Sequence, residues 1–239
     1  LEDGNLVPNT RYYLREDRLT KYESTGKYIN FSFYSYFWSD SIIFQNRIPY
    51  NYFTAKKIQP TGTHKFYSTI GNYGLFLYSI FSELKESSRK INEFYYRFGD
   101  EISPEYFIDE FLHVCDFLVE EMDENEEQLN NQFSLKQGSG TLLGSKSNKV
   151  NMIKAPWKSS LAYGVVLSCF SRANHITKDV KYLNKSKSLL KGYTEDFYSE
   201  IFGMPFYEEY PIEPGHYVLN GFIFALIGFY LFFILVKRN

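Results

Sequence analysis

Cysteine and histidine are scarce in this chain, and their spacing offers no metal site. The 239 residues include two cysteines, Cys115 and Cys169, and four histidines. Each cysteine falls inside a helical apolar pattern, so buried free thiols are expected rather than a disulfide framework. The histidines are scattered, without partners at the spacing of a metal-binding motif. The sequence therefore predicts neither a metal nor a cofactor.

An excess of charge of one sign is also lacking. The net charge is −2, with 26 Lys and Arg against 28 Asp and Glu, so nucleic-acid binding is not expected. The acidic run Glu120–Glu127 lacks the glycine and the alternating ligands of a calcium loop, and it reads as a solvated helix end. The glycines between residues 130 and 154 do not form the GxxxxGK[ST] pattern, which excludes a P-loop.

Aromatic residues, in contrast, are abundant. They make up 20% of the chain, with 22 Tyr and 23 Phe. A bias in nucleotide composition explains this simply, because Lys, Asn, Ile, Tyr and Phe rise together. A cleft in which ring faces stack on sugars is the functional alternative. Composition favours the first explanation and leaves the second open.

Periodicity predicts helices from about Ile70 onward. Apolar residues recur at three- and four-residue spacing from Ile70 to Leu84, which is typical of a helix face. Ser103 and Pro104 are start signals for a second helix. Two more helices, at 157–176 and 180–193, are joined by a short turn, which is typical of an antiparallel hairpin. Short strands are predicted near Phe133–Leu135 and Val150–Ile153. Before these helices, residues 1–61 read as an aromatic, strand-and-turn lead-in to a helical domain at 62–239, and Tyr28–Phe37 within it is rich in strand formers.

The stretch Phe206–Tyr230 combines reactive side chains with a buried helix. It begins with aromatic residues and two carboxylates, FYEEY. Pro211 and Pro214 follow, and each disfavours a helical conformation in the residue before it, so an extended loop is predicted. A nearly unbroken apolar run begins at Tyr217. The sequence therefore places Glu209 and Tyr210 on a loop held by a rigid helix.

This stretch resembles the C-terminal domain of the D-glucuronyl C5-epimerases. The matching letters are EEYP, a proline three residues later, and VLNGFIFALIGFY. The segment from Ala155 to Leu183 is similar to a second family motif, WYSxMAQGxxxSxxxRAxxxTxDxxYL. A weaker match lies at Ile70–Leu75, where IGNYGL stands against IAQYGL. The resemblance covers roughly residues 63–230, in the same order and at similar spacing.

The resemblance implies both a fold and a reaction. The fold is mainly α, an incomplete α/α toroid of antiparallel helical hairpins. The reaction inverts C5 of glucuronic acid in a polysaccharide by removal and return of a proton. Glu209 and Tyr210 match the family's catalytic pair. We place five further residues in the substrate cleft: Trp157, Lys158, Tyr207, Asn220 and Tyr73. The partner implied is a uronic-acid polysaccharide, and a homodimer is compatible with the resemblance. A eukaryotic chain would work in the Golgi lumen, and a bacterial one in the cytoplasm or at a membrane.

Three departures from the family pattern bear on activity. Lys158 replaces a tyrosine, and Tyr163 replaces the glutamine of the AQG motif. After Tyr230 nothing corresponds to the family's YDLRH-like segment, which carries a further Tyr-Arg set. From these departures we expect a C-terminally incomplete domain that turns over poorly by itself. A polysaccharide-binding protein without full catalysis is therefore the first alternative.

A membrane-tethered protein is the second alternative. Residues 218–236 carry no charge and precede Lys237 and Arg238. A helix of this length spans roughly 28 Å, close to the ~30 Å hydrocarbon core of a bilayer. The first part of this run, however, coincides with a buried helix of the family. A buried helix is therefore favoured over a membrane anchor.

Overall fold

The fold is built mainly from α-helices, which confirms the predicted fold class. The structure is a computed structural model, and it describes residues 40–54, 58–86, 103–137, 151–211, 215 and 217–236. The predicted strand at Tyr28–Phe37 lies outside the described residues. The described helices are α2 (Tyr67–Glu86), α4 (Pro104–Glu124), α5 (Ser160–Thr177), α6 (Val180–Glu195) and α7 (Leu219–Leu235).

Serine caps begin two of these helices. Ser103 has an extended backbone and its side chain accepts a hydrogen bond from the backbone N–H of Tyr106, at 3.3 Å, with Pro104 at the first helical position. Ser159 caps α5 in the same way, accepting from the N–H of Ala162 at 3.3 Å. The predicted start at Ser103 is thus confirmed, whereas α5 begins three residues after Trp157.

Replacing the first cap gives a simple test of how α4 is held. Ser103→Ala removes the acceptor for the Tyr106 N–H, so it should lower the free energy of unfolding by about 0.5–2 kcal/mol. Urea denaturation of the whole chain measures this loss. Ser103→Asp supplies another good cap acceptor and serves as the matched control. An equal loss in both variants would contradict the capping role.

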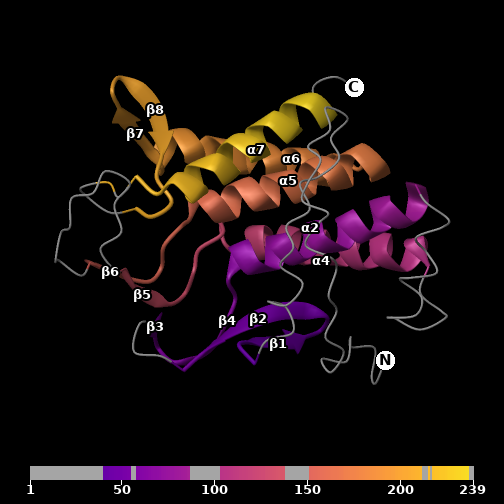
Figure 1. The fold of residues 1–239 in the computed structure, drawn as a ribbon, viewed down its shortest axis with the longest axis horizontal. Helices are drawn as coiled ribbons and strands as arrows, with labels where there is room; N and C mark the ends of the chain where they lie inside the picture. The colour runs from indigo at the N-terminus through magenta and orange to yellow at the C-terminus, as the bar shows by residue number, and fades with distance from the viewer. Residues whose placement is uncertain are drawn as a thin grey trace, which may run out of the picture.

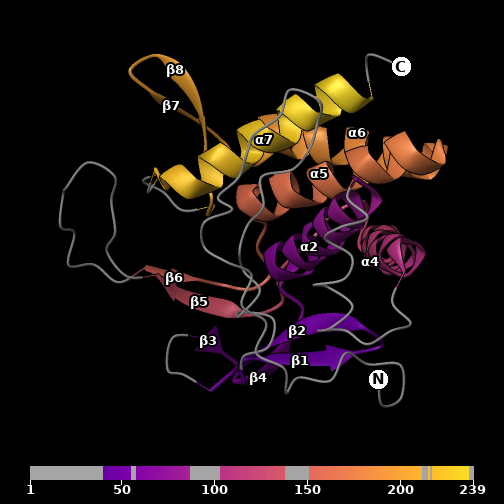
Figure 2. The same ribbon diagram turned by 45° about the vertical axis from the view of Figure 1, so that its right-hand side comes forward.

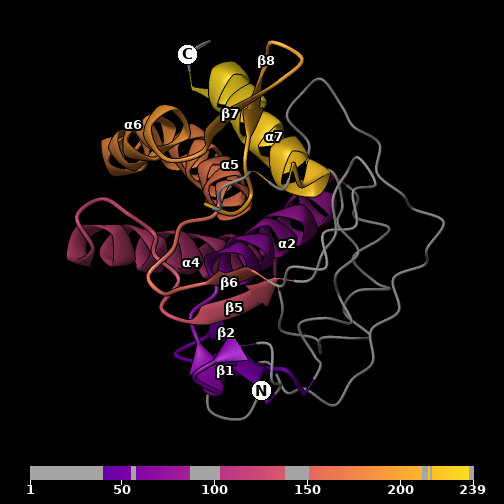
Figure 3. The same ribbon diagram turned by 90° about the vertical axis from the view of Figure 1, so that its left-hand side faces the viewer.

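The helices stack in layers above the strands. In Figure 1, α7 and α6 lie at the top with α5 beneath them, and α2 and α4 form the layer below. In Figure 3, α5 lies between α6 and α7 and above α2 and α4. α5 contacts α2, α4, α6 and α7. Nearly all of its residues from 160 to 173 are buried, because helices cover it on several sides.

α5 and α7 approach each other through backbone atoms. A Cβ added to Gly164 of α5 would lie 2.6 Å from the carbonyl carbon of Phe224 in α7. Across the same contact, a Cβ on Gly228 would lie 2.6 Å from the carbonyl oxygen of Gly164. Real Cβ atoms do not come this close to backbone. The two glycines therefore set the separation of the helices.

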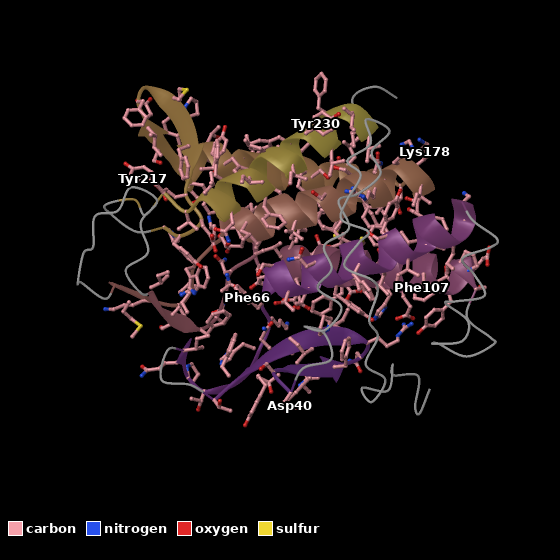
Figure 4. The ribbon with its side chains drawn as sticks, viewed as in Figure 1. Asp40, Phe66, Phe107, Lys178, Tyr217 and Tyr230 are labelled. Carbon is pink, nitrogen blue, oxygen red and sulfur yellow. The ribbon has the colours of Figure 1, made fainter. Side chains whose placement is uncertain are left out.

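α7 is apolar on both faces. Its buried side includes the small residues Ala225 and Gly228, which lie toward α5, and Gly221, which lies against Glu209. Its outward side carries larger apolar residues that are more than a third exposed: Leu219, Ile223, Leu226, Tyr230 and Phe233. Figure 4 shows Tyr230 pointing away from the body of the molecule. Within the described part of the chain, no helix is long and apolar enough to cross a membrane.

Two small sheets lie below the helices (Figure 2). Their strands are antiparallel, and the pairings cross the boundary expected at residue 61, since Asn51 pairs with His64 and Ile58 with Leu135. Strands at 134–137 and 151–153 confirm the two predicted there. The first sheet has the order β1 (Ile42–Gln45), β2 (Ile48–Phe53), β4 (Gly62–His64), and the second has β3 (Ile58–Gln59), β5 (Ser134–Gln137), β6 (Asn151–Ile153).

Ion pairs attach the first sheet to α4. Arg47, in the turn between β1 and β2, pairs with the buried carboxylate of Glu110. Lys65, after β4, pairs with Glu121 at 2.5 Å, and the Tyr67 hydroxyl donates to the same carboxylate at 2.7 Å. A buried carboxylate is costly unless it is paired, so these contacts explain why acidic residues lie on the covered face of α4.

Candidate functional site

The two adjacent carboxylates lie between a hairpin and a helix. The hairpin pairs β7 (Tyr198–Ile201) with β8 (Met204–Tyr207), and its turn contains Phe202 and Gly203 at positive φ. Such a turn matches the twist of the strands it joins. Glu208, Glu209 and Tyr210 follow β8 directly, and we call them the carboxylate segment. α7 begins at Leu219, and Figure 4 shows Tyr217 beside the hairpin, close to the N-terminal end of α7.

Glu208 is fully engaged in hydrogen bonds to its surroundings. One carboxylate oxygen accepts from the Ser199 hydroxyl at 3.1 Å, and the other accepts from the backbone N–H of Tyr217 at 3.0 Å. Its own N–H donates to the carbonyl of Phe197 at 2.8 Å. A Cβ on Gly215 would lie 2.9 Å from its carboxyl carbon, so a larger residue there would displace the carboxylate. Glu208 therefore links β7 to the residues just before α7.

Glu209 is held differently. Its side chain is buried beside α7, where a Cβ on Gly221 would lie 2.9 Å from the Glu209 Cγ. Burial raises the pKa of its carboxyl above the ordinary value, and hydrogen bonds from the Tyr210 hydroxyl and the Gly221 N–H oppose this rise. Among the described residues, its Oε2 atom has no hydrogen-bond partner. Burial thus favours the protonated form of this carboxyl, and one of its oxygens accepts no hydrogen bond from the described residues.

Tyr210 joins Glu209 to an aromatic cluster. Its ring lies 5.7 Å from the ring of Trp157, and the Trp157 indole donates to the carbonyl of Phe133 at 2.6 Å. Burial and the neighbouring Glu209 carboxylate raise the pKa of the Tyr210 hydroxyl well above its usual value. Tyr210 therefore keeps its proton at neutral pH. The expected proximity of Tyr210 and Trp157 is present in the structure.

The other predicted substrate residues are distributed over several environments. Tyr207 packs at 5.2 Å from the ring of Phe229, and Asn220 is exposed in the first turn of α7, next to Gly221. Lys158 pairs with Asp196 at 2.7 Å and lines a separate polar pocket against α6. Tyr73 is 1% exposed within the core. The structure thus brings Trp157 into contact with the carboxylate segment, leaves Asn220 exposed next to Gly221, and places Lys158 and Tyr73 elsewhere.

Sequence reasoning missed Asn131. Its backbone pairs with that of Trp157 in both directions, at 2.7 and 3.2 Å, so the two side chains lie on the same face of this antiparallel bridge. Its side-chain amide is buried, and in the described part of the chain neither amide atom has a partner. Nothing in the local sequence QLNN marks this residue, because its bridge partner lies 26 residues further along.

Comparison with known proteins assigns the region that contains this segment. Residues 142–239 match the family model described as D-glucuronyl C5-epimerase C-terminus. Over these residues the chain is similar to that family. The D-glucuronyl C5-epimerase of Caenorhabditis elegans is 40% identical over 79 residues, which are 31% of this chain and 13% of that protein. The chain thus aligns with only about an eighth of the length of this C5-epimerase.

The match to this family model confirms the resemblance carried by the two longer motifs. Both the Ala155–Leu183 segment and the EEYP stretch fall within residues 142–239. The weaker match at Ile70–Leu75 lies outside the residues that the family model covers. It belongs to α2, whose face contacts α4 and α5. No group of three or more metal-ligating side chains occurs among the residues that the structure describes.

Proposed function

We propose that this chain acts on uronic-acid residues of a polysaccharide by removing and returning the proton at C5, as a glucuronyl C5-epimerase-like protein. The observation that supports this most directly is the difference between its two adjacent carboxylates. Both oxygens of Glu208 accept hydrogen bonds, whereas one buried oxygen of Glu209 has no partner among the described residues and burial raises the pKa of Glu209. A general base needs such an oxygen within reach of the proton that it takes.

The C5 hydrogen of a uronic acid lies next to a carboxylate. In the proposed first step, Glu209 takes this proton, and the electron pair of the C5–H bond moves into the C5–C6 bond and onto the carboxylate oxygens. The enolate-like dianion that forms carries more negative charge than the substrate. The N-terminal end of α7, where Gly221 and Asn220 lie, has the positive pole of the helix dipole and favours this charge.

Tyr210 is the proton donor in this proposal. Its raised pKa keeps the hydroxyl protonated, as a donor must be. In the free protein the Tyr210 hydroxyl is hydrogen-bonded to the Glu209 carboxylate. In the proposed complex the sugar ring separates them, so that each faces one side of C5. After inversion Glu209 holds a proton and Tyr210 has lost one, and direct transfer between them restores both groups.

We further propose that α2 to α7 form part of an α/α toroid around a polysaccharide cleft. The hairpin of α5 and α6 supports this arrangement, as does the layering in Figure 3. Trp157 packs against Tyr210, and Asn220 is exposed next to Gly221, so we propose that these two residues contact the substrate.

Proton exchange at C5 provides the direct test. The whole chain, incubated with a glucuronate-containing polymer in deuterated water, should introduce deuterium at C5, which NMR of the polymer detects. A glucose polymer without the carboxylate is the control and should remain unlabelled, because its C5 hydrogen is not acidic. Binding of the glucuronate polymer without labelling would overturn the proposed catalysis and favour the polysaccharide-binding alternative.

A further inference from the structure

Glu208 connects three separate pieces of backbone around the carboxylate segment. Its side chain bonds to Ser199 in β7 and to the N–H of Tyr217 just before α7, while its own N–H bonds to Phe197. The side chain is only 6% exposed, so water competes little for these bonds. The hairpin and the start of α7 are thus joined through one carboxylate.

Tyr217 needs such support because its backbone is in an unfavourable conformation. Its φ angle is 51°, in the left-handed region that non-glycine residues rarely adopt. Such conformations persist when the surrounding structure holds them. Glu208 binds the Tyr217 N–H at 3.0 Å, and the Tyr217 ring packs 5.5 Å from the ring of Phe206. These contacts fix the direction in which the chain enters α7.

The start of α7 in turn determines the surroundings of Glu209. Val218 is the N-cap residue and provides no side-chain cap to orient the helix. Gly221, in the first turn, donates its N–H to the Glu209 carboxylate and fits closely against its side chain. A change in the direction of entry at Tyr217 would therefore move Gly221 relative to Glu209.

We infer that Glu208 is a positioning residue that holds Tyr217 in its left-handed conformation and thereby keeps the first turn of α7 in register with Glu209. This role rests on the proposed function only in taking Glu209 as the base. Glu208 does not contact the reacting atoms in this assignment. It acts through the backbone, from Tyr217 to Gly221.

Two substitutions at the same position separate bonding from charge. Glu208→Gln can keep both contacts, because its amide oxygen can accept from Tyr217 while its NH₂ group donates to the Ser199 oxygen. Glu208→Leu has a similar size and can make neither bond. Amide hydrogen exchange, followed by NMR on the whole chain, then reports on Tyr217 and Gly221 directly and without substrate.

In Glu208→Leu, the Tyr217 and Gly221 amides should exchange at least about tenfold faster, the factor expected for loss of a hydrogen bond to a charged group. The amide of Leu189, buried in α6, serves as the internal reference and should change only with global stability. Glu208→Gln should remain within about threefold of the wild type. For C5 labelling, the Leu variant should lose kcat with little change in KM, and the Gln variant should retain it.

Unchanged protection of the Gly221 amide in a folded Glu208→Leu variant would overturn the inference. Amide exchange in Glu208→Gln as fast as in Glu208→Leu would overturn it as well. If Glu208→Leu does not fold, Ser199→Ala is the alternative variant, because it removes one of the two contacts. It should produce a smaller increase in exchange at the Tyr217 and Gly221 amides. No increase at these amides would also overturn the inference. Absence of C5 labelling in the wild type would refute the proposed function, while the exchange measurement would still decide the positioning role.

Discussion

Glu209→Gln should reduce deuterium incorporation at C5 by at least about 100-fold, the effect typical of losing a general base. Glutamine preserves the shape of the side chain, and its carbonyl oxygen can still accept from the Tyr210 hydroxyl and the Gly221 N–H. It cannot take a proton from carbon. Labelling is followed by NMR of a glucuronate polymer in deuterated water. Glu208→Gln is the matched control, because it neutralises the neighbouring carboxylate, and it should label nearly as well as the wild type.

Equal labelling by wild type and Glu209→Gln would remove Glu209 from the mechanism. The same pair of proteins also gives a pH dependence that needs no substrate. The folded-state pKa of Glu209 is raised, so the native protein holds this proton at a pH where the unfolded chain releases it. Wild-type stability should therefore fall relative to Glu209→Gln as pH rises from the ordinary glutamate pKa through the raised one. Below that window the difference between the two should be constant.

Gly164→Ala should destabilise the whole helical stack and disturb the site. The added Cβ would lie 2.6 Å from the carbonyl carbon of Phe224, so α7 must move away from α5. Overpacking of this kind typically costs 1–3 kcal/mol, and the better helix propensity of alanine recovers about 1 kcal/mol at most. We expect a net loss of about 1–2 kcal/mol in urea denaturation. Labelling at C5 should fall as well, because α7 carries Gly221.

Ser168→Ala provides the control for this prediction. It lies one turn further along α5 and loses a hydroxyl that donates to the Gly164 carbonyl at 2.8 Å. Ser168→Ala removes the hydroxyl oxygen and adds no atom, so the separation of α5 and α7 can stay unchanged. The expected loss is about 1 kcal/mol or less, with C5 labelling maintained. A Gly164→Ala protein as stable and as active as Ser168→Ala would show that the helices can separate without consequence.

Local signals in the sequence were sufficient for most helix positions. Ser103 with Pro104 marks the start of α4, and the apolar spacing after Ile70 reveals α2, because caps and periodicity act within a few residues. The hairpin β7–β8 was missed, since its turn uses Phe202 and Gly203 rather than a common turn pair. Long-range partners were also out of reach. The carboxylate of Glu110 pairs with Arg47, which lies 63 residues earlier.

The candidate site could be located from the sequence but not resolved into roles. EEYP places two carboxylates side by side, and nothing in those letters distinguishes them. The distinction depends on Ser199 and Tyr217, which reach Glu208 from different elements, and on Gly221, which reaches Glu209. Lys158 illustrates the same limit. Its partner Asp196 lies 38 residues along the chain, at the end of α6, and could not be anticipated.

The contact between Gly164 and Gly228 has a consequence for how this domain can diverge. Where two helices meet through backbone, no neighbouring side chain can shrink to compensate for an added atom. A change at either glycine would require the whole of α7 to shift, and Gly221 would then move relative to Glu209. The outward positions, such as Ile223 and Leu226, can change in size without that penalty. Substitutions should therefore accumulate on the outer face of α7, whereas the residues of its inner face are constrained by the geometry of the site.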